Sequence, residues 1–403
     1  MKTIQSEAIH NAWNMLNEQE AISFLQELVR INSVNPPGGE KFVAEAIESR
    51  MQAAGLVVEL DEIAEGRTNL FVSLPANQNK RMENQPERIL AFSGHLDTVP
   101  IGSVQWKHEP FGAELAENKL YGRGTSDMKG GVAAMLMALD CLHRSGVQLK
   151  GSLRFVGTVG EEVDCLGAKH VVAKGQIDDA TAMIISEPSA NELYCAHKGA
   201  LWLTIDVFGK TAHGSMPEQG VNAIRVMNAF INKIEKLSLV YEPHPLLGGP
   251  SINIGTIEGG IKTNVVPDAC TMTLDIRTVP GQVHQDILAQ LHTILDALCK
   301  AAGASYQIEI ANDLPSITTP EDDAFTILAV ETAQKHLDSQ LTPKGVRYYT
   351  DGSIYAPHLE IPVLIYGPGE PLMAHQPDEW IEVEKYLESI RYFIALAVEY
   401  LGA

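Results

Sequence analysis

The chain has 403 residues, and two domains are the default expectation because a single hydrophobic core stops growing at roughly 250 to 300 residues. Hydrophobic residues make up 45% of the chain and charged residues 20%, which is typical of a globular protein rather than a disordered one. Lys and Arg total 30 against 51 Asp and Glu, and the net charge of −21 argues against nucleic acid or an anionic membrane surface as a partner.

The five cysteines are odd in number and widely spaced, with no C-x-x-C pair. They predict neither a disulfide framework nor a zinc-finger site, and reduced thiols favour a cytoplasmic location. The N-terminal segment mixes charges throughout and has no apolar signal core, and no stretch approaches about 18 uninterrupted apolar residues. We therefore expect an unexported protein without a membrane span.

Apolar strands alternate with amphipathic helices, the pattern of an α/β domain with a mostly parallel sheet. Four strands are predicted, at residues 89–93, 153–159, 182–186 and 361–366, and a surface loop near residues 77–88. The residues that follow these strands include titratable side chains, namely His95, Glu161, Glu162, Glu187 and, further on, His375. Ligands of open α/β sheets bind outside the carboxyl ends of the strands, so we expect these loops to meet at one crevice.

A glycine-rich loop, YGRGTSDMKGG at residues 121–131, delivers Asp127 just before a predicted helix. It is not a dinucleotide fingerprint, because Asp127 occupies the place of the third glycine. The chain also lacks a P-loop, an H-E-x-x-H motif and a G-x-S-x-G elbow, so a serine hydrolase has little support.

Between about residues 199 and 315 the pattern changes to β-α-β-β-α-β, which is typical of a self-contained ferredoxin-like unit. A helix with Thr319 as its N-cap and Pro320 in its first turn is then expected to resume the first domain. We predict a catalytic domain made of residues 1–198 and 316–403, with residues 199–315 as an inserted domain.

His95 and Asp97 stand two residues apart at the end of the first predicted strand. In a strand their side chains point to the same side, so the carboxylate can hold the imidazole in one tautomer, as in a metal-binding histidine. An isolated pair of this kind is more often a hydrogen-bonded histidine near a turn. The adjacent acids Glu161 and Glu162 strengthen the metal hypothesis, because they repel each other unless a cation or a shared proton relieves them. Two imidazoles and several carboxylates suit Zn²⁺.

Six ordered motifs, which span most of the chain, resemble those of a known enzyme family. They are SGHLDTVP, YGRGTSDMKGG, GTVGEEVDCLGA, ISEPSANELYCAHKGA, GKTAHGSMPEQGVNAI and GPGEPLMAHQPDEW. They are similar to the motifs of the acetylornithine deacetylase and succinyl-diaminopimelate desuccinylase family of dinuclear zinc amidohydrolases, relatives of aminoacylases and carboxypeptidases. The resemblance implies a zinc-peptidase-like catalytic domain with a mostly parallel sheet and an inserted ferredoxin-like dimerisation domain.

The resemblance also implies roles for residues of the catalytic domain. His95 and Glu187 hold one zinc ion, Glu162 and His375 hold a second, and Asp127 bridges the two; Co²⁺ is a possible substitute. Asp97 braces His95, Glu161 is the general acid/base, and the peptide bond after Asp127 is cis.

Further implied residues concern the substrate and the dimer. His213 stabilises the oxyanion. It does so in the active site of the neighbouring chain, in a homodimer formed through the inserted domain. Arg277 and Asn264 contact the substrate, and Gly352 and Ser353 add contacts. Because a guanidinium grips a carboxylate in bidentate fashion, Arg277 suits an N-acyl amino acid, although a strand-end ion pair is the alternative.

The sequence favours a succinylated substrate slightly, by likeness to bacterial desuccinylases. Acetylornithine or another N-acyl amino acid is the alternative. A metallo-dipeptidase or aminopeptidase and a non-catalytic metal-binding module are less favoured, because Arg277 suits acylated amino acids and Glu161 is present.

Overall fold

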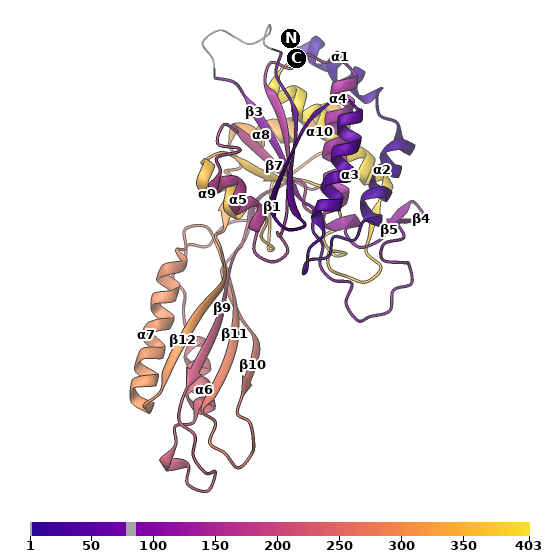
Figure 1. Ribbon diagram of the computed structural model, residues 1–403. Coiled ribbons are helices and arrows are strands. Elements are labelled where there is room, and N and C mark those ends of the chain that lie inside the picture. Colours follow the sequence, from indigo (N-terminus) through magenta and orange to yellow (C-terminus); the bar gives the residue numbers. More distant parts are fainter. Residues whose placement is uncertain (1, 78–85) are drawn as a thin grey trace. The chain divides into compact units, whose positions relative to one another are not determined.

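The computed structural model describes residues 2–77 and 86–403, so most of the surface loop expected near residues 77–88 lies outside the described residues. The chain divides into two compact units, which Figure 1 shows in ribbon form. The first is formed by Met1–Cys195, Thr318–Gly345 and Thr350–Ala403, and the second by Ala196–Ile317 and Val346–Tyr349. The short segment Val346–Tyr349 belongs to the second unit although it lies outside the predicted range of residues 199–315.

A mixed sheet with a parallel centre forms the core of the first unit, as expected. Within the described residues it has nine strands in the order β1-β2-β6-β3-β7-β15-β8-β13, and β14 also pairs with β8. The strands are β1 (Val57–Ala64), β2 (Arg67–Leu74), β3 (Ile89–His95), β6 (Ser152–Thr158), β7 (Ala182–Ile185), β8 (Tyr194–His197), β13 (Ile317–Thr318), β14 (Lys344–Val346) and β15 (Val363–Ile365). The central strands β6, β3, β7 and β15 run parallel, and β3 and β7 are buried along their whole length, as strands covered on both faces are.

Helices pack around this sheet. They are α1 (Lys2–Trp13), α2 (Glu18–Arg30), α3 (Glu40–Ala53), α4 (Gly130–Arg144), α5 (Leu166–Ala173), α8 (Ala324–Leu337), α9 (Gly352–Leu359) and α10 (Val383–Leu401). Helix α4 is buried without a break from Gly130 to Leu142, as a helix that is apolar on all sides must be, and it packs against α2, α10 and β3. A small separate sheet joins β4 (Glu114–Ala116), β5 (Lys119–Tyr121) and β16 (Trp380–Glu382). No helix in the described part of the chain is long and apolar enough to cross a membrane.

The second unit follows the predicted β-α-β-β-α-β order. Its elements are β9 (Gly199–Phe208), α6 (Ala223–Ile234), β10 (Ser251–Gly259), β11 (Ala269–Thr278), α7 (His284–Ala302) and β12 (Ser305–Leu314). The strands pair antiparallel in the order β10-β11-β9-β12. Alternate residues of β9 and β11 are buried in one hydrophobic cluster with α6 and α7, which leaves the other face of the sheet free of this unit's helices.

The predicted N-cap of the helix that resumes the first unit was wrong. Helix α8 begins at Ala324, and Asp323 caps it by accepting a hydrogen bond from the N–H of Phe325 at 2.8 Å. Thr319 has a different role. Its hydroxyl donates a hydrogen bond at 2.8 Å to the carbonyl of Val363, the first residue of β15.

Candidate metal centre

Four candidate residues lie at the carboxyl ends of neighbouring strands. His95 is the last residue of β3, Glu161 and Glu162 follow β6, and Glu187 follows β7. These strands are adjacent in the order β6-β3-β7 and run parallel, so their ends meet at one edge of the sheet. The topology therefore gathers an imidazole and three carboxylates that are far apart in the sequence.

Asp127 links two histidines at this edge. Its Oδ1 lies 3.2 Å from Nε2 of His95, and its Oδ2 lies 3.2 Å from Nε2 of His375. His95 also lies 3.8 Å from Oε1 of Glu187, and His375 lies 3.0 Å from Oε2 of Glu162. The structure thus brings all five expected metal ligands together, with one histidine and one glutamate on each side of Asp127.

The three glutamates of this cluster resist ionisation. Burial raises the pKa of Glu161 well above its usual range, and the carboxylate of Glu187 raises it further. Burial likewise raises the pKa of Glu187, and Asp127 and Glu162 add to the rise. The pKa of Glu162 is raised by burial and by Asp127. So many carboxylates close together need positive charge among them.

Protons supply that positive charge on the two histidines. Hydrogen bonds to Asp127 and Glu162 raise the pKa of His375 to about 10. Burial opposes a charge on His95, but Glu187 and Asp127 prevail and hold its pKa well above the ordinary value. Although burial raises it, the pKa of Asp127 is held below its usual range by these two histidines.

The donor set fits metal ions. Two groups have ligand atoms that all lie within 4.8 Å of one another, namely His95, Glu161 and Glu187, and His95, Asp127 and Glu162. Oε1 of Glu162 is buried and has no hydrogen-bond partner among the described residues, so it is available to a cation. Mixed imidazole and carboxylate ligands suit Zn²⁺ and its neighbours among the divalent transition metals.

The contact between His95 and Asp97 is made mainly by the backbone. Nδ1 of His95 lies 3.0 Å from the carbonyl oxygen of Asp97 and 3.5 Å from its Oδ1, and β3 ends at His95, so the strand alternation does not extend to Asp97. A carbonyl only accepts, so Nδ1 carries a proton, and Nε2 presents a lone pair to the site once its own proton is displaced.

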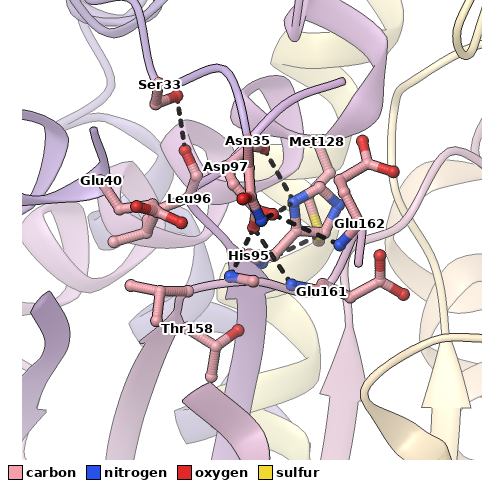
Figure 2. Close-up of polar contacts among 12 residues, drawn as sticks. Ser33, Asn35, Glu40, His95, Leu96, Asp97, Met128, Thr158, Glu161 and Glu162 are labelled. Carbon is pink, nitrogen blue, oxygen red and sulfur yellow. Dashed lines mark hydrogen bonds and ion pairs between the residues drawn. The ribbon is translucent and has the colours of Figure 1, made fainter. Parts of the chain in front are cut away.

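The Asp97 carboxylate instead holds the turn that carries the two glutamates. Its Oδ1 accepts hydrogen bonds from the N–H groups of Gly160 at 3.0 Å and Glu161 at 3.2 Å, and its Oδ2 accepts from the N–H of Glu162 at 3.3 Å. Figure 2 shows these bonds converging on the carboxylate. Asp97 is fully buried, and although burial raises its pKa, the neighbouring His95 imidazole and a hydrogen bond from Asn35 hold that pKa below the usual range.

Asn35 completes this arrangement, and sequence reasoning missed it. Its Nδ2 donates to Oδ2 of Asp97 at 2.9 Å (Figure 2). The segment Ser33–Asn35 lies along the chain that follows β3, since the N–H of Asn35 donates to the carbonyl of Thr98 at 2.8 Å and the Ser33 hydroxyl donates to that of Leu96 at 2.7 Å. The signal available was the segment SVNPPG, whose prolines mark a fixed loop.

Glu379 fixes the glycine-rich loop and was also missed. Its Oε1 accepts from the N–H groups of Ser126 at 2.8 Å and Asp127 at 3.0 Å, and its Oε2 pairs with Arg123 at 2.7 Å. The side chains of Glu379 and Arg123 are both buried. The peptide bond between Asp127 and Met128 is cis, as the resemblance predicts.

Gly352 and Ser353 open helix α9 in the first unit, where Ser353 is buried. The preceding residue, Asp351, was not anticipated. It accepts a hydrogen bond from the hydroxyl of Thr158, the last residue of β6, at 2.6 Å, and burial raises its pKa to about 6. Asp351 therefore adds a further buried carboxyl group beside the strand that leads to Glu161.

The other expected substrate contacts lie in the second unit. His213 is exposed, and its Nδ1 lies 2.7 Å from the hydroxyl of Ser215. Its loop contacts Asn264, whose carbonyl accepts from the N–H of Gly214 at 2.8 Å. Arg277 is half-buried at the end of β11 and pairs with Asp275 at 2.9 Å.

Known proteins resemble this chain over almost its whole length. A family model described as peptidase family M20/M25/M40 matches residues 91–399. A probable succinyl-diaminopimelate desuccinylase of Staphylococcus epidermidis is 28% identical over 417 residues, covering 96% of this chain and 99% of the relative. An acetylornithine deacetylase of Proteus mirabilis is 32% identical over 359 residues, covering 87% of each.

Solved structures share the fold at lower identity. Aminopeptidase PepT of Bacillus cereus matches with a TM-score of 0.76 and 24% identity, over 96% of this chain and 99% of that chain. A dinuclear metal-binding peptidase of the M20 family from Bacillus subtilis matches with a TM-score of 0.72 and 18% identity, over 95% of this chain and 98% of that chain. The family match extends over most of the chain, and the predicted resemblance is confirmed. This protein belongs to peptidase family M20/M25/M40 and is a metallohydrolase.

Proposed function

We propose that the protein is a dinuclear zinc amidohydrolase that removes the acyl group from an N-acyl amino acid, with a succinylated substrate favoured. The observation that carries the proposal is the position of Asp127 between two histidine–glutamate pairs, which is the arrangement that two cations sharing one carboxylate require. The full-length likeness to a desuccinylase and a deacetylase supports the choice of reaction.

His95 and Glu187 would hold one zinc ion, Glu162 and His375 the other, and Asp127 both. Bound zinc would supply a Lewis acid that polarises a carbonyl and lowers the pKa of water in the site toward about 7. Co²⁺ has similar ligand preferences and is expected to substitute.

Glu161 is the proposed general acid/base. A carboxyl group whose pKa is raised above its usual range accepts a proton more readily than an ordinary carboxylate and can return it to a leaving group. Burial and the neighbouring Glu187 raise the pKa of Glu161 in this way. It would take a proton from the attacking water and return it to the leaving amine, while Asp97 holds the backbone N–H of Glu161 in place.

The remaining roles concern the substrate. His213 would donate a hydrogen bond to the oxygen that becomes negative as the amide carbonyl is attacked. Arg277 and Asn264 would contact the amino-acid part, with Gly352 and Ser353 as further contacts. Residues 199–315 would pair two copies of the chain, and the buried, unpaired cysteines support a reducing cytoplasm.

A peptidase is the second candidate, because several proteins with this fold are named as peptidases. Those proteins are less than 25% identical to this chain, so they support the fold and not the substrate. The two more similar sequence relatives are named for succinyl and acetyl groups on amino acids, which favours deacylation.

A substrate panel tests the proposal. The zinc-loaded protein would be assayed with N-succinyl, N-acetyl and N-formyl derivatives of the same amino acids, and with di- and tripeptides as the peptidase control. We expect hydrolysis of acylated amino acids that a chelator abolishes and zinc restores. Faster turnover of free peptides than of every acylated amino acid would overturn the proposal.

A further inference from the structure

A cluster of cations lies in the second unit of this otherwise acidic chain. Lys198 directly precedes β9, Arg277 is the penultimate residue of β11, and Arg347 belongs to the segment Val346–Tyr349. The segment is attached beside Lys198, whose N–H donates to the carbonyl of Val346 at 3.2 Å. With 51 acidic residues against 30 basic ones in the chain, three basic side chains in one place are unexpected.

Arg277 is held rigidly with part of its guanidinium available. Its Nε pairs with Asp275, and its Cζ lies 5.9 Å from the ring centre of Trp202 and 5.8 Å from that of Tyr349. Asp275 also accepts from Nε1 of Trp202 at 2.9 Å. Trp202 and Tyr349 pack edge to face with ring centres 5.9 Å apart. A guanidinium fixed in this way presents its outer N–H groups in the fork that matches a carboxylate.

The other two cations have no carboxylate partner among the residues that the structure describes. Lys198 is 7% exposed, and its Nζ donates to the carbonyl of Gly249 at 2.6 Å. Burial lowers the pKa of Lys198, and Arg347 and Arg277 lower it further. Arg347 is exposed, and its guanidinium has no hydrogen bond or ion pair with another residue of the described chain. A buried ammonium with two positive neighbours is costly unless an anion compensates it.

The charges of the cluster define the ligand. Within the described residues the cluster contains three cations and one carboxylate paired with them, that of Asp275 with Arg277, so two positive charges are left over. An N-acetyl amino acid carries one carboxylate, whereas an N-succinyl amino acid carries two. Arginine and lysine side chains bind carboxylates through charge-assisted hydrogen bonds.

We propose that Lys198, Arg277 and Arg347 form one anion site for a substrate with two carboxylates, and that Arg347 distinguishes such a substrate from one with a single carboxylate. This inference rests on the proposed function and narrows its substrate class. It assigns Arg347 a role in specificity, through binding and not through the chemical step.

Paired substrates test the proposal. The kcat/KM values of the zinc-loaded wild type and R347Q would be measured for N-succinylalanine against N-acetylalanine, and for N-acetylglutamate against N-acetylglutamine. Removing a charge-assisted contact is expected to lower at least one dicarboxylate-to-monocarboxylate ratio by about tenfold, through KM. K344Q is the matched control, since Lys344 is exposed, lies three residues away and pairs with Glu192 at 2.9 Å. Unchanged ratios for both pairs in R347Q would overturn the proposal.

A binding measurement separates this inference from the proposed function. If the protein hydrolyses none of these compounds, succinate, acetate and inorganic phosphate would be titrated into the zinc-loaded wild type and R347Q by calorimetry. Acetate reports carboxylate binding to zinc alone. Tighter binding of succinate than of acetate in the wild type, lost in R347Q, supports the site. Equal affinities for succinate and acetate, or tighter binding of phosphate than of succinate, would refute it.

Discussion

Asp97 and Glu161 are joined through the backbone, since Oδ1 of Asp97 accepts a hydrogen bond from the N–H of Glu161 at 3.2 Å. The carbonyl of the same Asp97 lies 3.0 Å from Nδ1 of His95. One buried residue therefore orients both a proposed metal ligand and the proposed general acid/base, which makes it a sensitive point of the site.

The substitution Asp97→Asn should impair both zinc binding and catalysis. An amide offers an N–H₂ group where the turn of residues 160–162 presents N–H donors, so at least one donor loses its partner at a cost of about 1 to 3 kcal/mol. We expect zinc affinity or turnover to fall by about 10- to 100-fold, as is usual for residues that orient metal ligands. Asp179→Asn is the control, because Asp179 is an exposed acid paired with Arg154. Wild-type kinetics and zinc affinity in Asp97→Asn would contradict this role.

Glu161 and Glu162 are adjacent, yet their substitutions should differ in kind. We expect Glu161→Gln to lower kcat by at least about 10²-fold while the protein keeps two zinc ions, because a general acid/base is lost. Glu162→Gln should instead weaken zinc binding at one of the two sites, since Oε2 of Glu162 lies 3.0 Å from Nε2 of His375. Metal analysis and steady-state kinetics on both variants distinguish a general acid/base from a zinc ligand. Loss of zinc from Glu161→Gln would show that Glu161 is a ligand instead.

Much of this site could be predicted because its residues follow strands that are recognisable in the sequence. Continuous apolar segments predicted β3 and β7. His95 is the last residue of β3, and Glu187 follows β7 by two residues. Parallel strands bring their carboxyl ends to one edge whatever lies between them in the chain, so proximity follows from topology. The ferredoxin-like unit was predictable for a similar reason, since the alternation in β9 and β11 is visible in the sequence.

The residues that support the site were not predictable, because their partners are remote. Asn35 lies 62 positions from Asp97, and Glu379 lies 252 positions from Asp127. No local pattern identifies an acid that will be buried among backbone N–H groups. The predicted N-cap of α8 was wrong for a related reason. The Thr319 hydroxyl is hydrogen-bonded to Val363 in β15, which lies 44 positions further along the chain.

Zinc binding should stabilise the protein more as the pH rises. In the metal-free protein the pKa values of Glu161, Glu187 and His95 are raised well above their usual ranges, and that of His375 is raised to about 10. Groups with raised pKa values stabilise the fold below their unfolded values, near 4.5 for glutamate and 6.5 for histidine, and this stabilisation is lost as the pH rises through the folded values. Zinc must displace these protons, so its binding becomes more favourable over the same range.

The measurement is the thermal midpoint with and without zinc at pH 6 and pH 8. One free zinc concentration would be used throughout, equal to about 100 Kd at pH 6, where the stabilisation is about 2.7 kcal/mol; it should be larger at pH 8 because Kd is lower there. Calorimetry in buffers of different ionisation enthalpy should show proton release at pH 6. A zinc-induced shift that is the same at both pH values, with no proton release, would contradict the titration of this cluster.

His213 is expected to act in the site of a neighbouring chain. Its side chain is exposed in the second unit, beside the loop of Asn264, and no carboxylate of that unit pairs with it among the described residues. The sheet of this unit ends in β10, an edge strand whose Ile257 is 52% exposed, and edge strands of this kind are suited to pairing about a two-fold axis. A donor to the oxyanion is worth about 2.7 to 4 kcal/mol, so His213→Ala should be nearly inactive.

Complementation tests whether His213 serves its own chain or the neighbour. Glu161→Ala and His213→Ala chains, each inactive alone, would be mixed and allowed to exchange subunits, with exchange verified by mass. If His213 acts in trans, a mixed dimer carries both lesions at one site and none at the other, so up to half of the wild-type activity per mixed dimer should return. If His213 acts in cis, every site keeps one lesion, and a mixture that stays inactive after verified exchange would rule out the shared site.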